Sequence, residues 1–327
     1  MNRIARIARI AAMATLLALA LSALPAAAQN YPNRLTRLIL GFPPGGGTDI
    51  VARLLAQKLS EGFGQQVIVD NRPGANSNLA AEVVAKSPAD GYTLFLITGG
   101  LAINKALYNT LNYDLERDFA PVISVGSVPQ IIGVHPSLPV KSIAGLIAFA
   151  KSRPGQVGYA SAGTGSVEHI AGEMLGSMGG VKLLHVQYKG GGPAAVAVIS
   201  GEVSVSVNVL PAVLPFIQNG RIRCLAVTSE RRSSILPDTP TVAQSGLPGY
   251  EASVWYGVLA PRGTPREIVA KLNTELNRIL GLADVREKLA VLGADPLGGS
   301  PEAFGTLIRN SVAKYVKVVK DADIKVD

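Results

Sequence analysis

The chain has 327 residues and little of what disulfides and metal sites require. Cys224 is its one cysteine, which excludes an intramolecular disulfide, and the apolar run around it (223–228) is typical of a buried, inert thiol. His135, His169 and His185 are its three histidines, and none pairs with another at the spacing of metal ligands. We therefore expect neither a metal nor a cofactor.

Aromatic and charged residues are also sparse, at 5% and 17% of the chain, and the formal net charge is +8. Because the lysines and arginines are scattered and few aromatic rings are present to stack on bases, nucleic acid is not an expected partner. The 35 glycines and the 48% of hydrophobic residues are instead typical of a compact α/β protein with tight turns. A disordered chain is excluded by the same composition.

The N-terminus has the pattern of an export signal. Three arginines within the first nine residues precede an apolar run over 10–24, and Ala26-Ala27-Ala28 fits a small-x-small cleavage site. The run is short for a membrane span, and no other stretch approaches that length. We predict a signal peptide over 1–28 and a mature periplasmic protein over 29–327.

The rest of the chain alternates between strand and helix patterns, which predicts parallel sheets in an α/β fold. Its length favours two domains. The first unit reads as a strand over 38–42 and a helix with apolar residues between Ile50 and Leu59. Further strands are expected over 66–71, 92–98, 122–128, 130–134, 157–161, 182–188, 203–208, 223–228 and 253–259, and helices over 79–86, 142–152, 167–178, 193–200, 211–219 and 265–325, the last with a break at 293–299.

Three glycine-rich loops, at 45–47, 163–165 and 190–192, each follow a predicted strand and precede a helix. Free N–H groups and the dipole at a helix N-terminus favour an anion, and ligands of α/β sheets bind at the carboxyl ends of strands. Loops of this kind from two facing domains would line a cleft. The alternative is a set of tight turns with no ligand. Neither a Walker A sequence nor an intact G-x-G-x-x-G follows a predicted strand.

A few side chains near these loops have two interpretations. Asp49 is expected to cap the helix after the first loop. Tyr188 and Lys189 stand at a strand end, where either ligand contact or, for Lys189, a solvated surface position is expected. Ser166 and His169 would share one helix face, but G-x-S-x-G is absent and no acid stands near them. His169 is therefore expected to hold the loop or pack at the helix start.

Eight short segments run in one order along the mature chain: 42–49 (Phe-Pro-Pro-Gly-Gly-Gly-Thr-Asp), 70–75, 90–94, 104–108, 160–166 with His169, 188–190, 236–241 and 246–251. Together they resemble the exported solute receptors of the tripartite tricarboxylate transporter family, also called Bug receptors. The resemblance implies a two-domain periplasmic binding protein of the Venus-flytrap, type II-like kind, with a mostly parallel sheet flanked by helices in each domain. It places domain 1 over 29–130 plus 251–327 and domain 2 over 131–250.

The resemblance further implies a receptor with no chemistry of its own. A small carboxylate would bind in the interdomain cleft, held by backbone amides and partly through water. Membrane subunits of a tripartite transporter or a sensor kinase would be its partners, and the receptor is expected to be a monomer. The implied ligand-binding residues are Phe42, Pro44, Gly45, Gly46, Gly47, Asp49, Thr98, Ser161, Gly163, Thr164, Gly165, Ser166, Tyr188, Lys189, Gly190 and Asn208.

The chain departs from the family pattern at 76–80, at Gln187 and at Asn208. Asn208 replaces a usual aspartate at a strand end, and we expect its side chain to point into the cleft beside the 163–165 loop. Because asparagine carries no charge to attract an ammonium group, we expect a ligand without an amino group. An exported α/β hydrolase that uses Ser166 and His169 is the alternative function.

Overall fold

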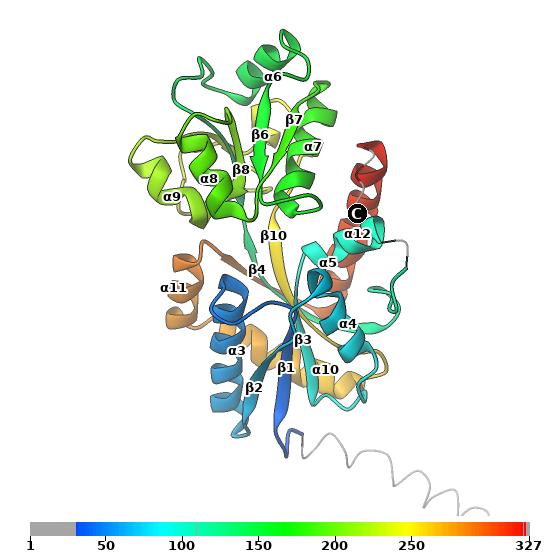
Figure 1. Cartoon of the computed structure of the whole chain (residues 1–327). Helices are drawn as coiled ribbons and strands as arrows, with labels where there is room; N and C mark the ends of the chain where they lie inside the picture. Colours follow the sequence, from blue (N-terminus) through cyan, green and yellow to red (C-terminus); the bar gives the residue numbers. More distant parts are fainter. Residues whose placement is uncertain (1–30, 109, 323, 325–327) are drawn as a thin grey trace, which may run out of the picture.

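The computed structural model describes residues 31–108, 110–322 and 324, so the predicted signal peptide lies outside the described residues. Figure 1 shows two lobes stacked along the long axis of the molecule, with β4 (Phe119–Val128) and β10 (Val254–Pro261) running towards the junction between them. Within the described part of the chain, every helix is too short or too polar to span a bilayer.

The first lobe is built on a six-stranded sheet in the order β11-β4-β10-β3-β1-β2. The strand β1 pairs in parallel with β2 and β3, whereas β10 and β11 pair antiparallel to β4, and β10 is also antiparallel to β3. The bounds of the strands not yet given are β1 (Thr36–Leu40), β2 (Val67–Asn71), β3 (Thr93–Thr98) and β11 (Asp295–Gly298).

Helices cover both faces of this sheet because successive side chains of a strand point to opposite faces, and here apolar side chains lie on both faces. Leu38 and Leu40 face a core made with α3 (Gly47–Phe63), α10 (Arg266–Leu280) and α11 (Ala283–Val291). Ile39, between them, faces the opposite core, to which three other helices contribute. Those helices are α4 (Asn78–Ala85), α5 (Gly100–Leu107) and α12 (Pro301–Asp321), and the short η1 (Ala75–Ser77) precedes α4.

The second lobe has a five-stranded sheet in the order β7-β6-β8-β5-β9, with β6 parallel to β7 and β8, and β5 antiparallel to β8 and β9. Its helices again cover both faces, α6 and α7 on one and α8 and α9 on the other. The elements are β5 (Gln130–Val134), α6 (Ile143–Lys151), β6 (Gly158–Ser161), α7 (Val167–Gly179), β7 (Leu184–Gln187), α8 (Gly191–Ile199), β8 (Val205–Val209), α9 (Leu210–Gln218), β9 (Arg223–Val227) and the short η2 (Ala243–Ser245).

The α/β fold class is confirmed, with a correction to the sheets, which are mixed. The parallel pairs join β1 to β2 and β3, and β6 to β7 and β8, because those strands are linked by helical crossovers. Two elements were missed, α5 and β11. The α5 helix starts directly after Gly99-Gly100, and β11 is a four-residue edge strand that contains Pro296. Trp255 is a core residue that packs edge-on against Phe304 and donates to Ser311 Oγ.

The carboxyl ends of the parallel strands in the two lobes face each other across the junction. Val167 and Val209, from the second lobe, pack against the first lobe's core. Gly165 lies so close to α5 that a Cβ atom on it would stand 2.7 Å from Leu107 Cδ1. The loop that follows β6 therefore lies against the first lobe, at α5.

The chain passes between the sheets twice, from Val128 to Gln130 and between Val227 and Val254. Gln130 joins the two crossings, since its side-chain Nε2 donates to the Ala252 carbonyl at 2.7 Å. Its backbone N–H donates to Thr228 Oγ1 at 2.9 Å. Hydrogen bonds thus tie the crossing segments together where the lobes meet.

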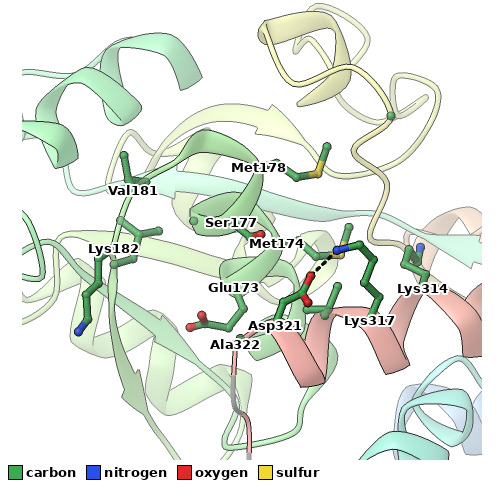
Figure 2. A pocket seen from close by; sticks show the side chains of 14 residues that line it. Glu173, Met174, Ser177, Met178, Val181, Lys182, Lys314, Lys317, Asp321 and Ala322 are labelled. Atoms are coloured by element: carbon green, nitrogen blue, oxygen red, sulfur yellow. Dashed lines mark hydrogen bonds and ion pairs between the residues drawn. The ribbon is translucent and has the colours of Figure 1, made fainter.

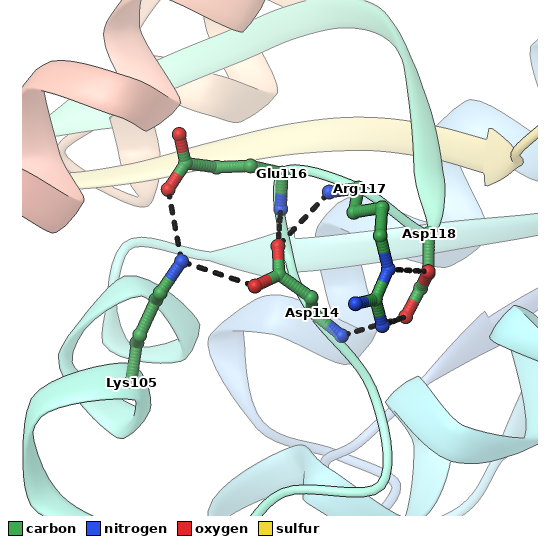
Figure 3. A network of polar contacts seen from close by, with 5 residues as sticks. All are labelled: Lys105, Asp114, Glu116, Arg117 and Asp118. Carbon is green, nitrogen blue, oxygen red and sulfur yellow. Dashed lines mark hydrogen bonds and ion pairs between the residues drawn. The ribbon is translucent and has the colours of Figure 1, made fainter.

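An ion-pair network secures the segment that leads from α5 to β4 (Figure 3). Lys105 Nζ, on α5, lies 3.1 Å from Asp114 Oδ2 and 3.2 Å from Glu116 Oε1. Arg117 Nε pairs with Asp118 at 2.8 Å. These side chains are largely solvent-accessible, so each pair contributes at most about 1 kcal/mol. Their role is to hold the chain against α5, whose N-terminus lies at the end of β3.

The close packing of α12 on the sheet yields the first prediction. A Cβ atom at Gly257 would lie 2.0 Å from Phe304 Cζ, and Phe304 is fully buried. Gly257→Ala should therefore lower the free energy of unfolding by about 1–3 kcal/mol in urea denaturation. Gly305→Ala is the matched control, because the nearest atoms stand at 3.4 Å and alanine favours a helix. Equal stability of the two variants would contradict this account.

Candidate ligand-binding site

The first-lobe loop between β1 and α3 is held by Asp49, which is 2% exposed. Its Oδ2 accepts the Gly45 N–H at 3.0 Å and Arg53 Nε at 2.8 Å, and its Oδ1 accepts Asn71 Nδ2 at 2.9 Å. Burial opposes ionisation of this carboxyl, but the hydrogen bonds from Arg53, Gly45 and Asn71 outweigh it and lower its pKa to about 2. Asp49 is thus a charged clamp inside the loop.

The same loop leaves amides free at the start of α3. Gly46 is the N-cap and contributes no side chain, so Asp49 acts from the first turn and not as the N-cap. Among the described residues, no hydrogen-bond acceptor is found for the amides of Gly46, Gly47 and Thr48. Gly46 and Gly47 are exposed, whereas Thr48 is half-buried beside the half-buried Tyr256. Three N–H groups therefore converge at a helix N-terminus, as an anion site requires.

In the second lobe, two predicted loops form one surface. The loop after β6 (162–166) and the loop after β7 (188–190) are joined by the Gly190 N–H, which donates to the Ala162 carbonyl at 3.1 Å. Thr164 Oγ1 also donates to Gln187 Oε1 at 2.6 Å. The glycine loops at 163–165 and 190–192 are therefore neighbours in space.

The glycines with positive φ have their amides occupied by the protein itself. The Gly163 N–H donates to Ser161 Oγ at 3.2 Å, and the Gly165 N–H donates to His169 Nδ1 at 3.1 Å. Gly45 and Gly190 are engaged in the same way, as described above. These glycines shape the loops, which need a backbone conformation that other residues rarely adopt. In the second lobe, the described residues provide no acceptor for the amides of Thr164, Gly191 and Gly192.

Behind the 162–166 loop lies a buried stack of aromatic rings that the sequence did not predict. The rings of His169 and His185 are nearly parallel, with centroids 3.7 Å apart, and Tyr159 stacks on His185 at 5.2 Å. Burial lowers the pKa of His169 to about 3, helped by His185, and lowers the pKa of His185 to about 4. Both rings are therefore neutral at physiological pH.

Ser166 and His169 do not form the nucleophile and base pair that a hydrolase needs. Ser166 Oγ accepts the backbone N–H of His169 at 3.1 Å, so the serine is the N-cap of α7. His169 Nδ1 accepts the Gly165 amide instead of the serine hydroxyl. The expectation that His169 holds the loop is confirmed. Ser161 does lie 2.6 Å from His185 Nε2, but its side chain is fully buried.

The remaining predicted residues stand around these loops. Thr98 ends β3, and Tyr188 donates to Glu202 Oε1 at 2.7 Å, while Lys189 is exposed. Asn208 is fully buried; its Nδ2 donates to the Gly191 carbonyl at 2.7 Å, and its Oδ1 has no partner. Asn208 thus lies beneath the start of α8, and the prediction that its side chain points into the cleft beside the 163–165 loop is wrong, because the Gly191 carbonyl takes up its amide in the interior.

Sequence reasoning missed several residues that shape the site. Asn71 comes from β2, His185 from β7 and Tyr256 from β10, and each reaches its loop only through the pairing of strands. Glu168, in the first turn of α7, is only 6% exposed, and this burial raises the pKa of its carboxyl. Asn71 lies in the 70–75 segment of the family resemblance, but no local motif marks the other positions.

Two grooves lie away from the predicted site. One of about 560 Å³ separates α7 from α12 and is lined by Met174, Met178 and Val181, with the ion pair of Lys317 and Asp321 at its edge (Figure 2). A second of about 840 Å³ lies beside the crossing segments and the 229–234 loop. None of the predicted ligand-binding residues lines either groove.

The histidine pair predicts how stability depends on pH. An unfolded histidine titrates near 6.5, so below that pH the unfolded state binds protons that the native rings refuse. The free energy of unfolding should fall between pH 6.5 and 4.5, by at most about 1.4 kcal/mol per pH unit for each ring. His185→Asn should reduce this slope relative to wild type in urea denaturation. The comparison with wild type removes the effect of Glu168, whose raised pKa acts in the opposite direction, and an unchanged slope would refute the assignment.

Comparison with known proteins identifies the family. The sequence model of the tripartite tricarboxylate transporter family receptor, TctC, matches residues 51–324. Protein BugT of Bordetella pertussis is 38% identical over 303 residues, which cover 92% of this chain and 93% of BugT. The structure of R. palustris Rpa4515 with adipate is 42% identical, with a TM-score of 0.76 and coverage of 90% of this chain and 99% of that one.

A further solved structure, MatC (Rpa3494) from Rhodopseudomonas palustris with bound malate, is 32% identical with a TM-score of 0.71, and the match covers 88% of this chain and 100% of MatC. The predicted resemblance is thereby confirmed. Family members are binding proteins and not enzymes, which excludes the hydrolase alternative. The chain belongs to the tripartite tricarboxylate transporter receptor (TctC) family of periplasmic solute-binding proteins.

Proposed function

We propose that this receptor binds a small carboxylate between its two lobes, by hydrogen bonds from backbone amides. The observation that carries the proposal is the set of unpaired amides at Gly46, Gly47 and Thr48 in one lobe and at Thr164 in the other. Charge-assisted hydrogen bonds contribute about 1.5–3 kcal/mol each. Three or four of them, less the cost of ordering, are enough for micromolar affinity, about −8 kcal/mol.

The distribution of charge supports a carboxylate ligand. The nearest cation in the first-lobe loop, Arg53, is already paired with Asp49, and Lys189 is exposed to solvent. The loops therefore offer directed N–H groups and helix dipoles, which suit a compact carboxylate better than a bulky phosphate. Adipate and malate, found in the solved relatives, are both dicarboxylates. A ligand with a carboxylate at each end would use one lobe for each.

Asn208 narrows the ligand class further. Its buried side chain carries no charge and stands under the start of α8. A site without an acid there has nothing to pair with an ammonium group. The proposed ligand is thus a C4–C6 or aromatic carboxylate without an amino group. The proposed site is the sixteen residues predicted from the sequence; Gly45, Gly163, Gly165 and Gly190 act through the shape of their loops, and the buried Asp49, Ser161 and Asn208 support the loops without touching the ligand.

Membership of the family supports a proposed cellular role. We propose that the chain is exported by its 1–28 signal peptide, works in the periplasm as a monomer and delivers its ligand to the membrane subunits of a tripartite transporter or to a sensor kinase. Its two domains are proposed to meet at 130/131 and 250/251; the strands of the second sheet run from Gln130 to Val227, and the first sheet resumes at Val254.

A thermal-shift panel tests the ligand class. Adipate or succinate at about 100 times its Kd should stabilise the native state by about 2.7 kcal/mol, which raises the melting temperature by several degrees. The corresponding diamide or diester should give no shift, because it lacks the charge that the amides recognise. Aspartate, compared with succinate, tests the ammonium argument. Equal shifts with the neutral analogue, or a larger shift with aspartate, would contradict the proposal.

Gly46→Val tests the use of the first-lobe amides. Gly46 has φ −81° and ψ 167°, and a Cβ atom there would meet only the Pro43 carbonyl at 4.0 Å, so valine should fold normally. Its side chain would occupy the place of the carboxylate. We expect affinity for adipate to fall at least about tenfold in calorimetry, equal to 1.4 kcal/mol, with little change in melting temperature. Gly46→Ala is the graded control, and a large loss of stability with intact binding would favour a turn without ligand contact.

A further inference from the structure

The buried rings behind the 162–166 loop have a geometry that the binding function does not by itself require. Tyr159 and His185 are direct neighbours on the parallel strands β6 and β7, so both side chains lie on the same face of the sheet. His169 comes from the first turn of α7 and stacks on His185 with an interplanar angle of 8°. The stack therefore joins two strands and the helix that follows the loop.

Each histidine connects to one amide of the loop. His169 Nδ1 accepts the Gly165 N–H directly, at 3.1 Å. His185 Nε2 lies 2.6 Å from Ser161 Oγ, and the same hydroxyl accepts the Gly163 N–H at 3.2 Å. Alternate glycine amides, at 163 and 165, are thus turned inwards, while the Thr164 amide between them has no acceptor among the described residues.

The proton positions follow from these contacts. His169 accepts at Nδ1, so its neutral form carries the proton on Nε2, which stands 3.8 Å from Glu173 Oε1. Glu173 Oε1 also accepts from Tyr159 OH at 2.7 Å. The ring of His169 is fixed by the stack on one side and by the hydrogen bond that its Nδ1 accepts from the Gly165 amide. A protonated Nδ1 could not accept the Gly165 amide, so the loop geometry needs the neutral ring.

We propose that the stacked pair of His169 and His185 positions the 162–166 loop so that the Thr164 amide faces the ligand. The inference rests on the proposed function and adds two positioning residues to it. The histidines touch no ligand. His169 takes up the Gly165 amide directly, and His185 holds the Ser161 hydroxyl that takes up the Gly163 amide, while the Thr164 amide between them has no acceptor among the described residues.

The test compares two substitutions at one position. His169→Leu keeps an apolar side chain under the loop and removes the acceptor, whereas His169→Asn places its Oδ1 close to where Nδ1 stood. Calorimetry with adipate should show about a tenfold weaker Kd for His169→Leu, as expected for losing one hydrogen bond, and recovery to within about threefold for His169→Asn. A role in stability alone would weaken both variants alike, and that result would overturn the proposal.

Amide hydrogen exchange by NMR separates this inference from the proposed function. The Gly165 amide should exchange faster in His169→Leu than in wild type and slowly again in His169→Asn. If wild type binds no member of the carboxylate panel, the proposed function fails, and unchanged Gly165 exchange in His169→Leu refutes the positioning role independently. If His169→Leu does not fold, Ser161→Ala removes the acceptor of the Gly163 amide with little change in volume. Unchanged Gly163 exchange and adipate affinity in Ser161→Ala would then overturn the proposal.

Discussion

The structure depends on one kind of interaction at its junction, the hydrogen bonds that side chains accept from glycine amides in the loops. A loop at a helix N-terminus exposes several N–H groups, and those that are buried need acceptors. Asp49 takes the Gly45 amide, Ser161 takes that of Gly163, and His169 takes that of Gly165. What is left unpaired in each lobe is a small set of donors with fixed directions. The proposed anion recognition is therefore a consequence of which amides the protein leaves open.

The two lobes solve the same problem with different acceptors. In the first lobe the acceptor is the Asp49 carboxylate. Its charge is neutralised by Arg53, and the side-chain amide of Asn71 donates a hydrogen bond to it. In the second lobe the acceptors are a hydroxyl and a neutral imidazole, kept uncharged by burial. A neutral acceptor adds no negative charge next to a bound anion, whereas the charge of Asp49 is already compensated. Both arrangements keep the surface that faces the ligand attractive to a carboxylate.

Gln130 links the two crossing segments to the second-lobe loop at 162–166. Gln130 stands where the chain crosses between sheets; its Nε2 donates to Ala252 on the returning segment and lies 3.3 Å from the Val167 carbonyl at the start of α7. Its Oε1 is buried without a partner. A buried amide oxygen without a hydrogen bond costs free energy. Because the Nε2 of the same side chain contacts both the returning segment and the start of α7, its arrangement is tied to the relative position of the lobes. The crossing segments and the ligand loop therefore share one polar contact network.

Much of the fold was predictable because local signals agreed. The strand, glycine loop and helix of residues 36–63 follow from an apolar run, two prolines, three glycines and a helical repeat. Signals failed where local sequence and tertiary role diverge. Four residues of α5, from Leu101 to Asn104, are all buried, so the helix has no polar stripe in its first turns to reveal its period, and β11 is a strand only because β4 offers it a free edge. The antiparallel direction of some strand pairs could not be predicted, because it depends on where the chain returns to the sheet in the tertiary structure.

The sequence by itself determined the family, the alternation of strands and helices, and the three loops whose glycines precede helices. These properties are local, since they depend on the identity and spacing of neighbouring residues. Only the tertiary structure decided which loop amides are open, because the acceptors that close the others are held by residues from adjacent strands: Asn71 Nδ2 donates to Asp49 Oδ1, and His185 bonds to Ser161 Oγ. It also decided that Asn208 lies beneath α8 and that His169 stacks on His185. Such contacts join residues far apart in the chain, and spacing along the sequence carries no information about them.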